Sequence, residues 1–260
     1  VLASAWTQSL IIGALFGVLC GVLISDIFGY FVLYLNTKPM LIGLALNILG
    51  SDGTVFILFM VTGSKANSLL LPSLVFPNVN IPFIQDIPVL GKLISGHNVM
   101  TYLAFASVFF VNWLVFKTNL GLRIRAVGEN PSAAESVGIN VSRTKMIAVL
   151  ISGVLASIGG VFMSMGYISS FTRDMVAGRG FIGIAAQNLG KGTPILTMLC
   201  TLMFGGAEAI GNIGQSYQLP SQFASMMPYV VTILGLVLMN LKNGKKDIKT
   251  NVSKNGKSDK

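Results

Sequence analysis

The chain has 260 residues, of which 53% are hydrophobic and only 10% are charged, and its mean hydropathy is +0.74. Because soluble domains carry about 25% charged residues, this composition excludes an ordinary soluble domain and indicates an all-α integral membrane protein. The net charge of +9 lies mainly in residues 117–145 and 242–260, which flank apolar spans. Basic blocks in that setting are typical of cytoplasmic segments, and no nucleic-acid partner is expected.

The first apolar stretch, residues 1–25, carries no charged side chain and is long enough to cross a bilayer core of about 30 Å. Gly13, Gly17 and Gly21 recur every four residues, so they share one helix face that another helix backbone can approach closely. Asp26 ends the uncharged run, and an aromatic, interfacial stretch follows it. We therefore expect the first span to end near residue 25.

A second span is expected at residues 39–63. It contains Asn47, Asp52 and several glycines, a combination that is costly against lipid. One interpretation is that the helix bends or unwinds at residues 50–53 beside a cavity, as discontinuous transporter helices do. The alternative is that Asn47 caps or hydrogen-bonds a neighbouring helix.

Residues 64–98 contain four prolines and cannot form a single helix. They carry few Lys or Arg residues for their length, which predicts an extracytoplasmic loop. We expect this apolar, proline-rich segment to lie over the outer membrane face. There it either supports the docking of a solute-binding protein or forms a packed lid with no partner.

Further spans are placed at residues 99–116, 146–169, 194–211 and 221–241. A shorter apolar piece at 181–190 either extends back to about residue 176 or enters a cavity as a half-helix. The result is a helical bundle of about seven spans or half-spans in residues 1–241, followed by a Lys-rich cytoplasmic tail at 242–260. With residues 117–145 also cytoplasmic, Val1 falls outside, which predicts upstream N-terminal helices missing from this sequence.

Small residues mark the span at 146–169 as a helix that its neighbours wrap tightly. Residues four apart share a helix face, so each row of small side chains offers one surface for close approach. The rows consist of Ala156, Gly160 and Ser164, and of Gly153 and Ser157.

The longest polar segment between apolar ones, residues 121–145, contains a short helix with both ends marked. Asn130 is a good N-cap because its side-chain oxygen accepts a backbone N–H, and Pro131 suits the first helical position. Gly138 closes the helix in the left-handed conformation after about two turns. Such a rigid knob suits docking into a groove on a soluble partner. An ordinary solvated loop is an equally good interpretation of these residues alone.

The string RAVGENPSAAESVGI at 125–139 resembles the cytoplasmic coupling loop of ABC importer permeases of the simple-sugar and nucleoside branch, within the branched-chain amino acid and ribose permease-like family. Further similarity lies in GLALNIL at 43–49, IPVLG at 87–91 and AGRGFIGIAA at 177–186. The resemblance covers essentially the whole chain and is closest to the nucleoside-type permease subunits. It implies a subunit that moves nucleosides or related ribosides inward by alternating access.

In this family the coupling loop presses into a cytoplasmic ATPase. The positions to which the resemblance assigns this role are Arg125, Ala126, Gly128, Glu129, Asn130, Pro131, Ala133, Ala134 and Gly138. The resemblance also implies a second permease subunit, in a heterodimer or a homodimer, and an extracytoplasmic solute-binding lipoprotein. ATP and Mg²⁺ would be used by the ATPase chain, and no cofactor is expected on this chain.

The sequence has no Walker A string, and its one histidine, His97, stands apart from any nucleophile or metal-ligand cluster. We therefore expect neither catalytic nor metal-binding residues, as suits a transport subunit that is not an enzyme. A simple sugar such as ribose or galactose is the alternative substrate. A function of another class, as an ion-coupled secondary carrier or a membrane scaffold without transport, stays open because Asp52 or Glu208 could couple an ion.

The substrate path is expected to run past polar interruptions of the apolar spans. Amide side chains both donate and accept hydrogen bonds, so they suit a neutral ligand with hydroxyls and base edges. Aromatic rings could stack on a base, although at an interface they more often act as anchors. Glu208 is expected to pair with Arg173 or Arg179. The pathway candidates are Asn47, Gln187, Asn188, Glu208, Phe171 and Phe181.

Overall fold

The computed structural model describes residues 1–64, 67–68, 74–79, 95–167, 170–216, 226 and 230. These residues are almost entirely helical, and five of their helices are long and apolar enough to cross a membrane. The predicted fold class, an all-α polytopic membrane protein, is therefore confirmed. The chain divides into two compact units, Val1–Ala177 and Gly178–Lys260, which are described separately.

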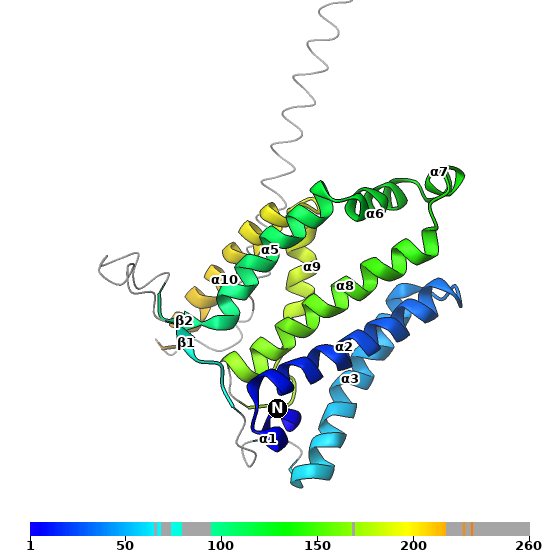
Figure 1. The fold of residues 1–260 in the computed structure, drawn as a ribbon. Coiled ribbons are helices and arrows are strands. Elements are labelled where there is room, and N and C mark those ends of the chain that lie inside the picture. The colour runs from blue at the N-terminus through cyan, green and yellow to red at the C-terminus, as the bar shows by residue number, and fades with distance from the viewer. Residues whose placement is uncertain are drawn as a thin grey trace, which may run out of the picture. The chain divides into compact units, whose positions relative to one another are not determined.

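The first unit is organised around two long helices that lie side by side, α2 and α8 (Figure 1). Two shorter helices, α6 and α7, form a corner between α5 and α8 (Figure 1). The elements of this unit are α1 (Leu2–Thr7), α2 (Leu10–Leu33), α3 (Pro39–Thr62), β1 (Asn78–Val79), β2 (His97–Asn98), α5 (Val99–Lys117), α6 (Asn119–Glu129), α7 (Pro131–Ser136), α8 (Val141–Phe162) and the π-helix η1 (Met163–Tyr167).

The first predicted span is corrected at both ends. Gln8 adopts a left-handed conformation with φ 48°, which ends α1, and Ser9 is extended before α2 begins at Leu10. α2 then continues through Asp26 to Leu33. One charged side chain on an exposed face does not break a helix, because every backbone hydrogen bond of the helix is retained.

The small face of α2 is confirmed: Gly13 packs against Ser4 of α1, and Gly17 and Gly21 pack against α8. A Cβ added to Gly17 would lie 3.0 Å from Cγ2 of Val161, and one added to Gly21 would overlap Ser157. The relation is reciprocal, because a Cβ on Gly153 would overlap Ser25. The two backbones thus approach as closely as small-residue seams allow in membranes.

Of the two small rows predicted on α8, the one containing Gly153 and Ser157 faces α2. By contrast, an added Cβ at Gly160 would meet nothing within 4 Å among the described residues. Ala156 and Gly160 are thus exposed within the part of the chain that the structure describes, whereas Ser164 at the end of the same row is half-buried.

The predicted unwinding of the second span at residues 50–53 is wrong. α3 is one continuous helix from Pro39 to Thr62, with Gly63 closing it in the left-handed conformation at φ 70°. The hydroxyl of Thr54 donates to the Gly50 carbonyl at 2.7 Å, which satisfies this polar side chain within the helix itself. Two glycines cost a helix only about 1 kcal/mol each, whereas unwinding in lipid leaves several backbone groups unpaired.

The described parts of the 64–98 loop contain two short antiparallel strands, β1 and β2. Asn98 of β2 is buried, and its side-chain nitrogen donates to the Phe76 carbonyl at 2.8 Å while its Oδ1 accepts from the Met100 amide at 3.0 Å. The same side chain thus caps α5 and fixes the backbone of the loop at Phe76. Residues 80–94, which include the IPVLG string, lie outside the described residues.

In its described part, the second unit is a hairpin of α9 (Arg179–Leu189) and α10 (Pro194–Ser216). Ala186, Leu189 and Phe204 form its buried core. α9 does not extend back to residue 176, because Ala177 and Gly178 have φ angles of 46° and 74° that no α-helix continues through. Its 11 residues cover about 16 Å.

The end of α10 also corrects the sequence prediction. The helix continues to Ser216, past the turn expected from residue 212, since Gly and Asn lower helix propensity by only about 1 kcal/mol each. The predicted last span at 221–241 and the tail at 242–260 lie outside the described residues, apart from positions 226 and 230.

Candidate functional site

The polar segment after α5 begins with a tight corner. The hydroxyl of Thr118 donates to the Leu114 carbonyl at 2.5 Å and accepts from the Gly121 amide at 3.1 Å, which caps α6. A Cβ at Gly121 would collide with the Leu114 carbonyl, so glycine allows this close approach. We did not predict α6, although Thr118 is a good N-cap and apolar Leu120, Ile124 and Val127 recur at helical spacing.

The short helix α7 is capped at both ends as predicted. Oδ1 of Asn130 accepts from the Ala133 amide at 3.1 Å, and Pro131 occupies the first helical position. Gly138 has φ 85°, its amide bonds to the Glu135 carbonyl at 2.9 Å, and the Ile139 amide bonds to the Ala134 carbonyl at 3.1 Å. This pair of bonds is a Schellman motif, which satisfies the last carbonyls of the helix.

The structure separates the predicted coupling residues into buried and exposed positions. Only 4% of Ala134 is exposed and Ala126 is half-buried, so both pack inside the corner formed by α6 and α7. The guanidinium of Arg125 lies 5.1 Å from the Phe116 ring centroid, a cation–π contact that ties α6 to α5. The residues left exposed are Arg125, Gly128, Glu129, Asn130, Pro131, Ala133 and Gly138.

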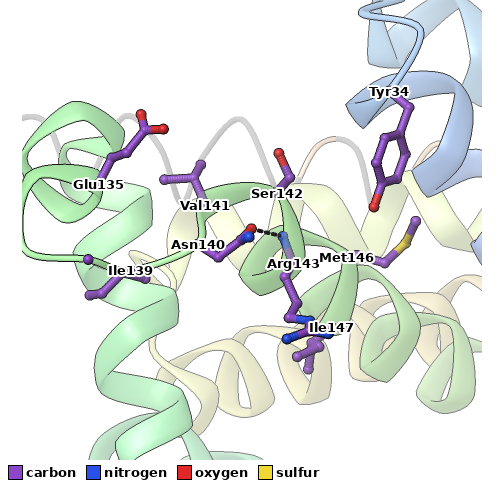
Figure 2. A pocket seen from close by; sticks show the side chains of 10 residues that line it. Tyr34, Glu135, Ile139, Asn140, Val141, Ser142, Arg143, Met146 and Ile147 are labelled. Carbon is purple, nitrogen blue, oxygen red and sulfur yellow. Dashed lines mark hydrogen bonds between the residues drawn. The ribbon is translucent and has the colours of Figure 1, made fainter.

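Two hollows border the turn that connects α7 to α8. The larger, of about 900 Å³, is lined by Tyr34 and Met146 on one side and by Glu135 on the other, as Figure 2 shows. The smaller, of about 550 Å³, lies between α6 and the start of α8. Asn140 lines both hollows and caps α8, because its Oδ1 accepts from the Arg143 amide at 2.9 Å (Figure 2). This cap explains why α8 begins at Val141, five residues before the predicted span.

The pathway candidates fall in both units. In the first unit, Asn47 is exposed on α3, and Phe171 is held by two 2.8 Å hydrogen bonds that its backbone makes with Ser68. In the second unit, Phe181, Gln187 and Asn188 are all exposed on α9.

Among the described residues, one face of α9 packs on α10, which leaves Phe181, Gln187 and Asn188 exposed on the rest of the helix. The structure therefore groups three of the six candidates. It places Asn47 and Phe171 in the other unit.

Two of the acids in the candidate membrane spans, Glu208 and Asp52, have a basic partner. Glu208 lies 2.7 Å from Arg179, which confirms the expected pairing with one of two arginines. The other arginine, Arg173, lies 3.7 Å from Asp52, although about two thirds of each of these two side chains is exposed. Among the described residues, no three His, Cys, Asp or Glu side chains gather into a group that could hold a metal ion.

A family profile described as "Branched-chain amino acid transport system / permease component" matches residues 1–236. The chain belongs to this permease family. The permease is 38% identical over 199 residues to the guanosine ABC transporter permease protein NupQ of Bacillus subtilis, covering 75% of this chain and 62% of NupQ. It is 35% identical over 229 residues to the nucleoside ABC transporter permease protein NupC of Lactococcus lactis, covering 86% of this chain and 71% of NupC.

A more distant relative broadens the comparison. The putative glucose ABC transporter permease protein TsgC13 of Haloferax volcanii is 27% identical to this permease over 225 residues, covering 86% of this chain and 67% of TsgC13. The permease thus spans less than two thirds of the length of NupQ and about 70% of the other two relatives. No solved structure matches this permease.

Proposed function

We propose that this permease is the membrane subunit of an ATP-driven importer that moves nucleosides or related ribosides across the cytoplasmic membrane. The observation that carries the proposal is that NupQ and NupC, at 38% and 35% identity, are named as guanosine and nucleoside permeases. ATP would be hydrolysed with Mg²⁺ by a cytoplasmic ATPase. A second permease subunit and an extracytoplasmic solute-binding lipoprotein would complete the transporter.

The test is reconstitution of the whole transporter in proteoliposomes with its ATPase and binding protein. Guanosine, adenosine, uridine, ribose and galactose are compared as stimulants of ATP turnover and as radiolabelled solutes. We expect nucleosides to stimulate both activities and sugars to leave them near the basal level. Stimulation by ribose or galactose alone would replace this substrate with a simple sugar, the alternative that the similarity to TsgC13 favours. Uptake without the ATPase, driven by an ion gradient, would instead identify a secondary carrier.

For coupling, we propose that α7 is the element on which the ATPase acts. The helix is rigid because it is capped at both ends, and it presents Pro131 and Ala133 on its exposed side next to Glu129, the exposed last residue of α6. Closure of the ATPases on ATP would push this knob, and the inner and outer parts of the bundle would then rock about a midplane site. In this arrangement residues 117–145 and 242–260 face the cytoplasm and residues 64–98 face outward.

Bulky substitutions test the coupling role. Ala133→Trp and Glu129→Trp should leave membrane insertion and assembly intact while ATP turnover no longer drives uptake. Leu122→Trp is the matched control, because Leu122 is an exposed residue of α6 outside the matching motif. Normal coupled transport by both knob variants would mean that α7 is only a solvated turn.

For the pathway, we propose that exposed amides contact the solute. Gln187 and Asn188 are exposed on α9, as is Phe181, so hydrogen-bonding groups and a stacking ring lie on the same short helix. Asn47 lies about 12 Å along α3 from Pro39, near mid-depth of the span. Asn47→Ala and Gln187→Leu should weaken apparent affinity or change selectivity in uptake assays. Unchanged uptake together with a lower melting temperature would identify both amides as packing groups.

A further inference from the structure

The smaller hollow beside the α7–α8 turn has a chemistry that the coupling role does not use. It has a volume of about 550 Å³ and is enclosed by α6, by residues 137–140 and by the first two turns of α8. Arg123 and Arg143 reach it from the two helices, together with Asn119 and Thr144. No carboxylate lines it, whereas Glu135 lines the neighbouring larger hollow.

Both arginines are uncompensated in the part of the chain that the structure describes. The ion pairs found there join Arg173 to Asp52 and Arg179 to Glu208, so neither Arg123 nor Arg143 has a carboxylate within ion-pair distance. Two guanidinium groups with amide and hydroxyl neighbours form a donor-rich site for an oxyanion. Arginine binds phosphate oxygens through paired N–H donors, which makes phosphate the best-fitting group.

The same hollow also has an apolar side. Leu120, Ile139 and Ile147 line it, and Ile147 lies one turn along α8 from Arg143. α8 is a candidate membrane span that begins at Val141, so Arg143 lies in its first turn, at the level of lipid headgroups. A ligand with a phosphate at the arginines and a hydrocarbon chain along Ile147 would satisfy both sides.

We propose that this hollow binds the headgroup of an anionic phospholipid. The arginines hold the phosphate, the apolar residues accept the upper part of an acyl chain, and the lipid bridges α6 to α8. Because α7 connects these two helices, a bound lipid would brace the knob on both sides. A recessed, partly apolar hollow at headgroup level fits a lipid better than it fits an acidic protein segment. The inference does not depend on which solute is transported.

The experiment measures lipid binding directly on the purified chain. Native mass spectrometry and thermal unfolding are recorded in detergent with added phosphatidylglycerol, phosphatidylcholine or inorganic phosphate. We expect phosphatidylglycerol to bind and to raise the melting temperature, while phosphatidylcholine and inorganic phosphate have little effect. The double substitution Arg123→Gln with Arg143→Gln should weaken phosphatidylglycerol binding at least tenfold.

Lys145→Gln is the matched control, because Lys145 lies two residues after Arg143 on α8 but lines neither hollow. An equal loss with Lys145→Gln would overturn the proposal in favour of general surface charge. Equal stabilisation by inorganic phosphate would identify a free-anion site instead, and also overturns it. Should the double variant not fold, Arg143→Lys keeps the charge but loses the paired donors. Its phosphatidylglycerol binding should fall severalfold, and wild-type binding by this variant would contradict the site.

Discussion

Small residues are concentrated in two regions of this permease, and they serve opposite purposes there. Along α2 and α8, Gly21 and Gly153 face side chains so closely that a Cβ would overlap them. In the α6–α7 corner, Gly128 has no atom within 4 Å of the equivalent position, and Ala133 is exposed. The difference teaches that small residues in the span allow helices to pack, while Gly128 and Ala133 at the corner leave a surface uncovered.

The largest effect is expected from placing a large side chain in the seam between α2 and α8, where Gly21 contacts Ser157 and Gly153 contacts Ser25. Gly21→Leu should lower stability by about 3 kcal/mol, since the new side chain collides with Ser157 of a packed helix. The measurement is the melting temperature of the purified protein in detergent. Gly160→Leu is the matched control, because an added Cβ there meets nothing within 4 Å in the described chain. An equal fall in melting temperature for the two variants would mean that the seam is packed no more tightly than the exposed position at Gly160.

The second unit offers a different kind of helix contact to compare with the seam. Glu208→Gln should cost about 1–2 kcal/mol, because the Arg179–Glu208 pair is about two thirds buried but partly screened. A double-mutant cycle with Arg179→Gln, followed by thermal unfolding, measures the coupling between the two side chains. A coupling energy near zero would mean that only the apolar core, and not the ion pair, stabilises the α9–α10 hairpin.

At the corner, removing a cap should act locally. Asn130→Ala should destabilise α7 by about 1 kcal/mol, since the Ala133 amide loses its acceptor. Hydrogen exchange at residues 131–138 should accelerate while the global melting temperature stays unchanged, in contrast to the seam variant. Ser132→Ala serves as the control, because its hydroxyl is not the capping group. A fall in global melting temperature for Asn130→Ala would mean that the corner is part of the packed core.

The smallest effect is expected from the Lys-rich tail. Deleting residues 244–260 should leave uptake nearly unchanged, because the proposed role of the tail is only to hold the C-terminus in the cytoplasm. Each basic residue near the membrane surface is attracted to anionic lipid by about 1 kcal/mol. Uptake and surface expression are measured together in cells. Complete loss of transport with normal expression would reveal a binding role for the tail.

Part of the candidate site was predictable because it depends on neighbours in sequence. The Asn130 cap, Pro131 at the first helical position and the left-handed Gly138 are all formed within nine residues, so their signals are local. α6 had a comparable signal in Thr118 but was obscured by its high content of polar residues. The unwinding proposed for α3 failed for the opposite reason: glycines and polar residues weaken a helix locally, but lipid penalises every unpaired backbone group.

The sequence by itself determined the membrane class, the positions of most spans and the caps of α7, because hydropathy and capping act through adjacent residues. Only the tertiary structure decided that Gly153 and Ser157, rather than Gly160, face α2. It also decided that Glu208 pairs with Arg179, and that the side chains of Arg123 and Arg143 meet around one hollow. These outcomes depend on how helices rotate and pack against one another. The sequence pattern is compatible with several helix faces and does not decide which of them contacts a neighbouring helix.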